Sequence, residues 1–142
     1  MKPRDLHRLL ATTIPAKEPV LIVGPPGTGK TDIVTQAAAA CKADLVVMHP
    51  VVSEPFDFKG LPGIVGGKAE FLPFGDLRVL LEAKRLTACF LDDLGQAPPT
   101  VQAAAMQLIL ARRVNSHAVS DKVVFLAATN RKGDRAGVTG IL

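Results

Sequence analysis

The chain has 142 residues, of which 48% are hydrophobic and 21% charged, so it can bury one core but not two. No apolar run approaches the roughly 18 residues of a membrane span, and no signal-peptide pattern is visible, so we expect a cytoplasmic protein without a membrane partner. The formal net charge of +4 is weak support for a nucleic-acid partner, because the basic residues are scattered and no aromatic residues alternate with them.

The first part of the chain predicts a helix, a strand and then a phosphate-binding loop. Residues 5–12 predict a short amphipathic helix, and residues 20–23 predict a buried strand. The strand is followed by the P-loop pattern G-x-x-x-x-G-K-S/T. The residues predicted to bind nucleotide are Gly24, Pro25, Pro26, Gly27, Thr28, Gly29, Lys30 and Thr31.

The loop pattern has a physical basis. Gly24 and Gly29 can adopt positive φ, so the backbone can wrap around a polyphosphate. Its N–H groups then turn inward, and the N-terminus of the helix predicted at 32–41 adds positive potential. Lys30 is predicted to contact the β- and γ-phosphates of ATP, and the Thr31 hydroxyl to bind Mg²⁺. The alternative is a plain Gly/Pro turn, but the strand before it and the helix after it favour the phosphate site.

The middle of the chain is less regular. Residues 44–48 predict a second strand, and residues 76–84 predict a helix. Between them, residues 50–74 are rich in Gly, Pro and Phe and predict loops or a small hairpin. Phe56 and Phe58 leave two interpretations open there: a hydrophobic anchor that faces a client or a neighbouring subunit, or side chains packed beneath the loop.

Polar side chains follow two further predicted strands. The predicted strand at residues 88–91 is followed by Asp92 and Asp93, and the predicted strand at residues 123–128 is followed, after Thr129, by Asn130. Ligands bind at the carboxyl edge of an open α/β sheet. Asp92 is therefore predicted to hold Mg²⁺, mostly through water, and Asp93 to orient or deprotonate the attacking water. Asn130 is predicted to hydrogen-bond the γ-phosphate or that water, with a plain strand-end Asn as the alternative.

The remaining elements complete the prediction of fold class. A helix is predicted from Pro98 to Arg113, with proline tolerated in its first turn. The alternation of strands and helices is typical of an α/β protein with a mainly parallel sheet, here as one domain over residues 1–142. Cys41 and Cys89 lie in apolar surroundings without metal-ligand spacing, so free thiols in a reducing cytosol are expected.

The order of the motifs GPPGTGKT, FLDD and ATN resembles the Walker A, Walker B and sensor 1 motifs of AAA+ ATPases. The details are similar to the MoxR-like branch, which carries D-E-x-N-R-A-P and then Q-x-A-L-L-E-x-M-x-E-R-x-V. This chain has residues 92–98 and 102–114 at the same spacing, and residues 55–60 resemble the branch's P-x-D-x-x-G element. The resemblance implies a three-layer αβα P-loop NTPase, Mg²⁺-dependent hydrolysis of ATP, a ring that is most often a hexamer, a client protein and a von Willebrand A-type partner.

Several positions differ from the family pattern. Asp93 stands where the family has Glu and is one methylene shorter, so its water could be activated less well or with a different geometry. Arg112 matches the family. Four further positions differ: Gly95, Gln96, Gln107 and Ala111.

The resemblance also implies parts that this sequence lacks. The family's core continues past sensor 1 to an arginine finger, a fifth strand and a helical lid, so we expect a partial AAA+ core that ends after the fourth core strand. In the implied sheet order 5-1-4-3-2, the strand at residues 20–23 then lies at an open edge, which favours association. Alone, such a chain is expected to form no defined ring and to hydrolyse ATP very slowly, if at all.

Three functions are compatible with the sequence. The first is an ATP-hydrolysing module that remodels a client protein. The second, favoured by Asp93, is a nucleotide-binding interaction module with little turnover. The third is a DNA-linked AAA+ ATPase such as a loader, an initiator or a phage packaging accessory. Phosphate release separates the first two, and salt-dependent DNA binding identifies the third.

Overall fold

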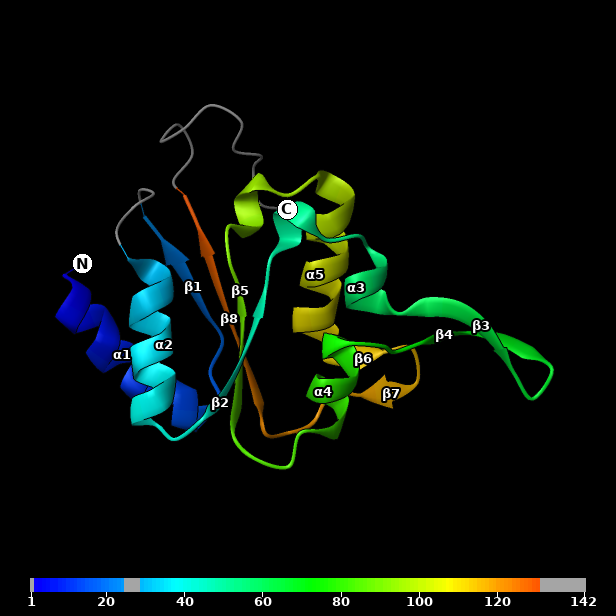
Figure 1. Ribbon diagram of the computed structural model, residues 1–142, viewed down its shortest axis with the longest axis horizontal. Helices are drawn as coiled ribbons and strands as arrows, with labels where there is room; N and C mark the ends of the chain where they lie inside the picture. The colour runs from blue at the N-terminus through cyan, green and yellow to red at the C-terminus, as the bar shows by residue number, and fades with distance from the viewer. Residues whose placement is uncertain (1, 25–28, 131–142) are drawn as a thin grey trace.

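The computed structural model describes residues 2–24 and 29–130 as three layers, with a parallel sheet between two layers of helices (Figure 1). The sheet has the order β1-β8-β5-β2, and every neighbouring pair is parallel. Its strands are β1 (Val20–Val23), β2 (Asp44–Met48), β5 (Thr87–Leu91) and β8 (Val123–Thr129). The predicted three-layer α/β fold is confirmed, and the order of the four strands agrees with the implied 1-4-3-2.

Helices α1 (Pro3–Ala16) and α2 (Lys30–Ala40) cover one face of the sheet, and α4 (Asp76–Glu82) and α5 (Pro99–Ala111) lie on the other (Figure 1). Each face has its own core. Phe90 and Leu126 pack with the α1–α2 side, whereas their neighbours Leu91 and Phe125 pack with the α5 side, because successive strand residues point to opposite faces. All residues of β5 and β8 are buried, which explains their continuous apolar runs.

The segment between β2 and β5 contains more structure than the sequence predicted. A 3₁₀ turn (Pro50–Val52) and the short helix α3 (Phe56–Lys59) precede an antiparallel hairpin of β3 (Leu61–Val65) and β4 (Lys68–Leu72). The hairpin projects from the body of the molecule (Figure 1). Gly66 and Gly67 form its two-residue turn with φ of 58° and 78°, the conformation that favours glycine at both turn positions.

The two phenylalanines of α3 have different environments. Phe58 is 1% exposed and belongs to the core on the α5 side, whereas Phe56 is 40% exposed. The interpretation in which both form a surface anchor is therefore wrong for Phe58. Gly60 follows with φ of 90°, and a Cβ there would lie 2.7 Å from the Leu72 carbonyl oxygen, so the base of the hairpin requires glycine.

Strand β1 lies at one edge of the described sheet and pairs only with β8 there. Its side chains alternate in exposure: Ile22 is 8% exposed, whereas Leu21 and Val23 are 49% and 52% exposed. An open strand edge with exposed apolar side chains is a template for association. A second hairpin, β6 (Arg113–Val114) with β7 (His117–Ala118), lies between α5 and β8 and was not predicted.

Candidate functional site

The candidate site lies at the carboxyl edge of the sheet, where the ends of β1, β2, β5 and β8 lie side by side. Gly24 donates its N–H to the Thr129 carbonyl at 3.1 Å, so the loop after β1 starts beside the end of β8. Pro25, Pro26, Gly27 and Thr28 lie outside the described residues. Gly29 has φ of 74° and precedes the first residue of α2, in agreement with the expectation for the end of the loop. Gly24 does not adopt positive φ in this structure.

Lys30 begins α2 and is 9% exposed. Its Nζ donates to the Gly24 carbonyl at 3.1 Å and to Asn130 Oδ1 at 3.4 Å. Asn130 follows β8, which is hydrogen-bonded to β1, so two residues at opposite ends of the sequence meet in one site. Asn130 is 3% exposed, and its Nδ2 has no hydrogen-bond partner among the described residues. A buried amide donor of this kind is suited to a phosphate oxygen or a water.

Thr31 and Asp92 also meet, because the Thr31 hydroxyl donates to Asp92 Oδ2 at 3.1 Å. The described residues contain no group of three or more His, Cys, Asp or Glu side chains that could hold a metal ion. A hydroxyl and a carboxylate are nevertheless suitable ligands for Mg²⁺, which takes oxygen ligands at about 2.1 Å and keeps several waters. The Thr31 oxygen could be a direct ligand while the Asp92 carboxylate beside it holds waters of the ion, so the Thr31–Asp92 pair fits Mg²⁺.

Asp93 differs from Asp92 in both backbone and electrostatics. It has φ of 54° and ψ of 40°, a left-handed conformation that is unfavourable for a residue with a Cβ. Burial raises the pKa of the Asp93 carboxyl, and so does the neighbouring Asp92, while Lys30 and His49 act in the opposite direction. A half-buried carboxyl whose pKa is raised and which lies at the end of a central strand is a candidate general base.

His49 is a residue of the site that the sequence analysis missed. It directly follows β2, and the Asp92 N–H donates to the Met48 carbonyl at 3.0 Å, so the ends of β2 and β5 lie side by side. The same reasoning that singled out Asp92 and Asn130, a polar residue directly after an apolar strand, applies to His49. Its charge favours the ionised form of Asp93.

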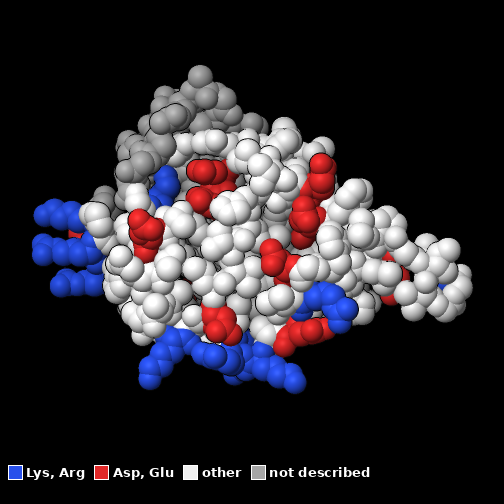
Figure 2. Space-filling view, viewed as in Figure 1, with Lys and Arg blue, Asp and Glu red and all other residues white. Residues whose placement is uncertain are grey.

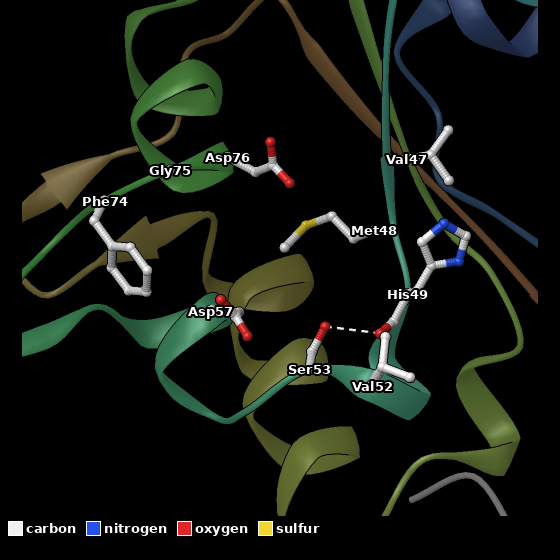
Figure 3. A pocket seen from close by; sticks show the side chains of 9 residues that line it. All are labelled: Val47, Met48, His49, Val52, Ser53, Asp57, Phe74, Gly75 and Asp76. Carbon is white, nitrogen blue, oxygen red and sulfur yellow. Dashed lines mark hydrogen bonds between the residues drawn. The ribbon is translucent and has the colours of Figure 1, made fainter.

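A pocket of about 200 Å³ opens beside His49, between the end of β2, the segment before α3 and the start of α4 (Figure 3). Asp57, Ser53 and Asp76 lie around it together with Met48 (Figure 3). Ser53 donates its hydroxyl to the His49 carbonyl at 2.7 Å, and Asp57 Oδ2 accepts the Glu54 N–H at 2.8 Å. These bonds fix the loop that follows β2.

Charges are distributed unevenly on the face shown in Figure 2. Acidic side chains occupy a hollow below the grey residues and further places on this face, whereas basic side chains gather at the opposite end and along the left side of the molecule. The four parallel strands begin at that opposite end, and the exposed residues directly before them include Lys42, Lys84, Arg85 and Lys122. Carboxylates at the carboxyl edge are suited to a divalent cation.

Arg112 has a structural environment. Its guanidinium donates to the carbonyls of Ser120 and Val123, each at 2.9 Å, and lies 5.5 Å from the centre of the Phe125 ring. These contacts tie the end of α5 to the start of β8.

No helix among the described residues is long and apolar enough to cross a membrane.

Three features together define a P-loop nucleoside triphosphatase. They are a parallel sheet of this strand order, a Lys-Thr pair at the start of the helix after the edge strand, and an acidic pair after a central strand. The sequence pattern of one family, the AAA domain of the dynein-related subfamily, matches residues 19–136. The chain belongs to this family.

Solved structures agree with this fold. A candidate ATPase of Cytophaga hutchinsonii ATCC 33406 is 19% identical with a TM-score of 0.63, over 98% of this chain and 41% of that one. The Holliday junction branch migration motor RuvB of Thermotoga maritima is 19% identical with a TM-score of 0.59, over 94% and 39% of the two chains. NtrX of Brucella abortus in complex with ADP is 18% identical with a TM-score of 0.59, over 90% and 29%.

The chain spans about two fifths or less of the length of these structures. No curated protein matches it significantly. The likeness to solved structures shows the fold, and family membership shows an AAA+ ATPase module.

Proposed function

We propose that the chain binds and hydrolyses ATP with Mg²⁺, as the ATPase module of a MoxR-like AAA+ protein that remodels a client. The observation that carries the proposal is the contact of Lys30 with both Gly24 and Asn130, beside the Thr31–Asp92 pair. Four functional side chains from three separate segments converge at one edge of the sheet: Lys30, Thr31, Asp92 and Asn130. Each carries the group that a phosphate, a metal ion or a water requires.

The proposed reaction assigns one role to each side chain. The Lys30 ammonium binds the β- and γ-phosphates, and Asn130 Nδ2 donates to a γ-phosphate oxygen or to the attacking water. Asp93 accepts a proton from that water as its oxygen bonds to the γ-phosphorus. The bond from the γ-phosphorus to the bridging oxygen breaks, and ADP and phosphate leave. Bound Mg²⁺, held by Thr31 and Asp92, would neutralise the charge on the phosphates.

The proposal is tested by measuring ATP binding by calorimetry and phosphate release in parallel. Lys30→Ala is expected to weaken ATP binding at least tenfold, or about 1.4 kcal/mol, with an unchanged circular dichroism spectrum. Asp92→Asn should weaken binding that depends on Mg²⁺, and Asp93→Asn should spare binding and lower turnover in the full-length ATPase. Lys42→Ala is the control, because Lys42 is exposed and precedes β2 at the opposite edge. Unaltered ATP affinity in Lys30→Ala would contradict the proposal.

The proposal also includes the partners that the resemblance to MoxR-like ATPases implies. A ring, most often a hexamer, is expected for the longer ATPase, together with a client protein and a von Willebrand A-type partner. The likeness to RuvB, described as a Holliday junction branch migration motor, supports a DNA-linked ATPase as the second candidate. Stimulation of phosphate release by DNA, falling as salt is raised, would favour that candidate.

A further inference from the structure

Gln102 is a fully buried amide in an otherwise apolar part of α5. Its side chain is 0% exposed, and its neighbours Val101 and Ala105 belong to the core on the α5 side. Most buried side-chain amides are held by hydrogen bonds. Gln102 Nε2 donates to the Ala97 carbonyl at 2.9 Å and to the Gly95 carbonyl at 3.4 Å, whereas Gln102 Oε1 has no hydrogen-bond partner among the described residues. Both acceptors lie in the turn that connects β5 to α5.

That turn carries Asp93. The 3₁₀ turn Leu94–Gln96 begins directly after Asp93, and the Gln96 N–H donates to the Asp93 carbonyl at 3.0 Å. The Ala97 N–H then donates to the Leu94 carbonyl at 3.2 Å. Asp93 itself has a left-handed backbone, which persists only where the surrounding structure holds it in place.

Two kinds of contact hold the turn. Leu94 and Ala97 are 1% and 0% exposed and belong to the core, but apolar burial is non-directional. The hydrogen bonds from Gln102 are directional, so they orient the carbonyls of Gly95 and Ala97 and close the end of the turn.

We infer that Gln102 is a positioning residue for hydrolysis, which acts by fixing the turn that places the Asp93 carboxylate. The inference rests on the proposed role of Asp93 as the group that activates water. Gln102 does not touch the nucleotide site itself, because its amide reaches Gly95 and Ala97. Its loss should therefore change the rate of hydrolysis and leave nucleotide affinity almost unchanged.

The test compares Gln102→Met with the parent chain. Methionine keeps the length of the side chain but removes the donor. Phosphate release at saturating ATP is expected to fall about ten- to a hundredfold, as for a small misplacement of a reacting group, while the calorimetric affinity for ADP changes less than about twofold. Amide hydrogen exchange over residues 94–97 is expected to be at least about fivefold faster than in the parent.

The control variant is Leu108→Ala, in the same helix and 1% exposed. It should lower the melting temperature at least as much as Gln102→Met, yet keep the rate of phosphate release and the slow exchange over residues 94–97. Gln102→Asn, whose amide is one methylene too short to reach both carbonyls, serves as a second variant should the first not fold. Its rate and exchange should change in the same direction.

The outcomes separate this inference from the proposed function. A longer ATPase that contains this chain and binds ATP but releases no phosphate would overturn the hydrolytic function, and exchange over residues 94–97 would then decide whether Gln102 holds the turn. Unchanged exchange in the Gln102 variants overturns the inference. So does an unchanged rate in variants of an active parent, or a rate loss of equal size in Leu108→Ala.

Discussion

Asp93 combines two features that are unfavourable for folding. Its backbone is left-handed, and its carboxyl pKa is raised by burial and by Asp92. Unfavourable backbone and charge at one residue are typical of functional sites, where the rest of the fold compensates for them. The stability of the chain should therefore increase when the charge of Asp93 is removed.

Asp93→Asn is expected to raise the melting temperature of the nucleotide-free chain at pH 7 by about 2–5 °C. Because the folded-state pKa lies above the ordinary value of 3.8, the ionised carboxyl destabilises the folded chain above that pKa. This destabilisation is lost as pH falls through the raised pKa toward 3.8. The difference between variant and parent should shrink over the same range in thermal scans at several pH values. A gain that does not depend on pH would assign the effect to the backbone alone, since Asn tolerates this conformation.

Asn130→Ala is expected to lower the rate of phosphate release much more than the affinity for ADP. The amide lies against Lys30 Nζ, near the predicted position of the γ-phosphate, and ADP lacks that group. Rates and calorimetric ADP affinities of the parent and the variant provide the measurement. Thr129→Ser is a suitable control, since it changes the preceding buried residue and keeps the hydroxyl. Equal losses for ATP and ADP would favour a plain strand-end role for Asn130.

The sequence predicted those residues of the site that carry a recognisable local pattern. Lys30 and Thr31 follow from the loop pattern, and Asp92 and Asn130 from their places after apolar strands. His49 also follows an apolar strand, and the implied sheet order places that strand beside β5, so the same pattern was sufficient to predict it. Contacts such as the one from Gln102 to Ala97 depend on how a side chain folds back over a turn. The periodicity of the sequence does not predict such contacts.

At the scale of single elements, α3 was the hardest to predict. Four residues are too few to show helical periodicity, and its two phenylalanines are equally apolar in the sequence. Only the tertiary structure distinguishes Phe58 in the core from Phe56 at the surface. The hairpin β6–β7 has two residues in each strand, which is also too short for an alternating pattern. Long apolar strands such as β8, in contrast, were predicted to within one residue.

The pair of phenylalanines in α3 gives a matched test of this difference. Phe58→Ala is expected to lower the free energy of unfolding by about 3–5 kcal/mol, because it leaves a cavity in the core. Phe56→Ala should change it by less than about 1 kcal/mol. Urea unfolding of both variants provides the measurement. Similar losses for the two would mean that Phe56 is also buried in solution, whereas loss of client-stimulated activity in Phe56→Ala alone would make it a contact residue.

For the whole molecule, the open edge at β1 has the clearest consequence. Leu21 and Val23 are exposed on a strand whose outer edge is unpaired among the described residues. We expect the chain to associate irregularly, and Leu21→Lys to reduce that association because a charge on an edge strand opposes pairing. Light scattering coupled to size exclusion, with and without ATP and Mg²⁺, measures it. Lys substituted for the exposed Ile64 of the projecting hairpin is the control, and a discrete nucleotide-dependent hexamer of the parent would contradict the expectation.

The order of the sheet also determines when the chain can fold during its own synthesis. Strand β8 is the last of the four described strands to be made, yet it lies between β1 and β5, so β1 has no partner among these strands until the ribosome has passed residue 129. Until then β2 and β5 can pair, while β1 has only α1 and α2 to pack against and no strand to pair with. Since long-range pairing is slow, the nascent chain presents an unprotected apolar strand while residues 24–129 are made. We expect chaperones that bind emerging polypeptides to recognise that strand.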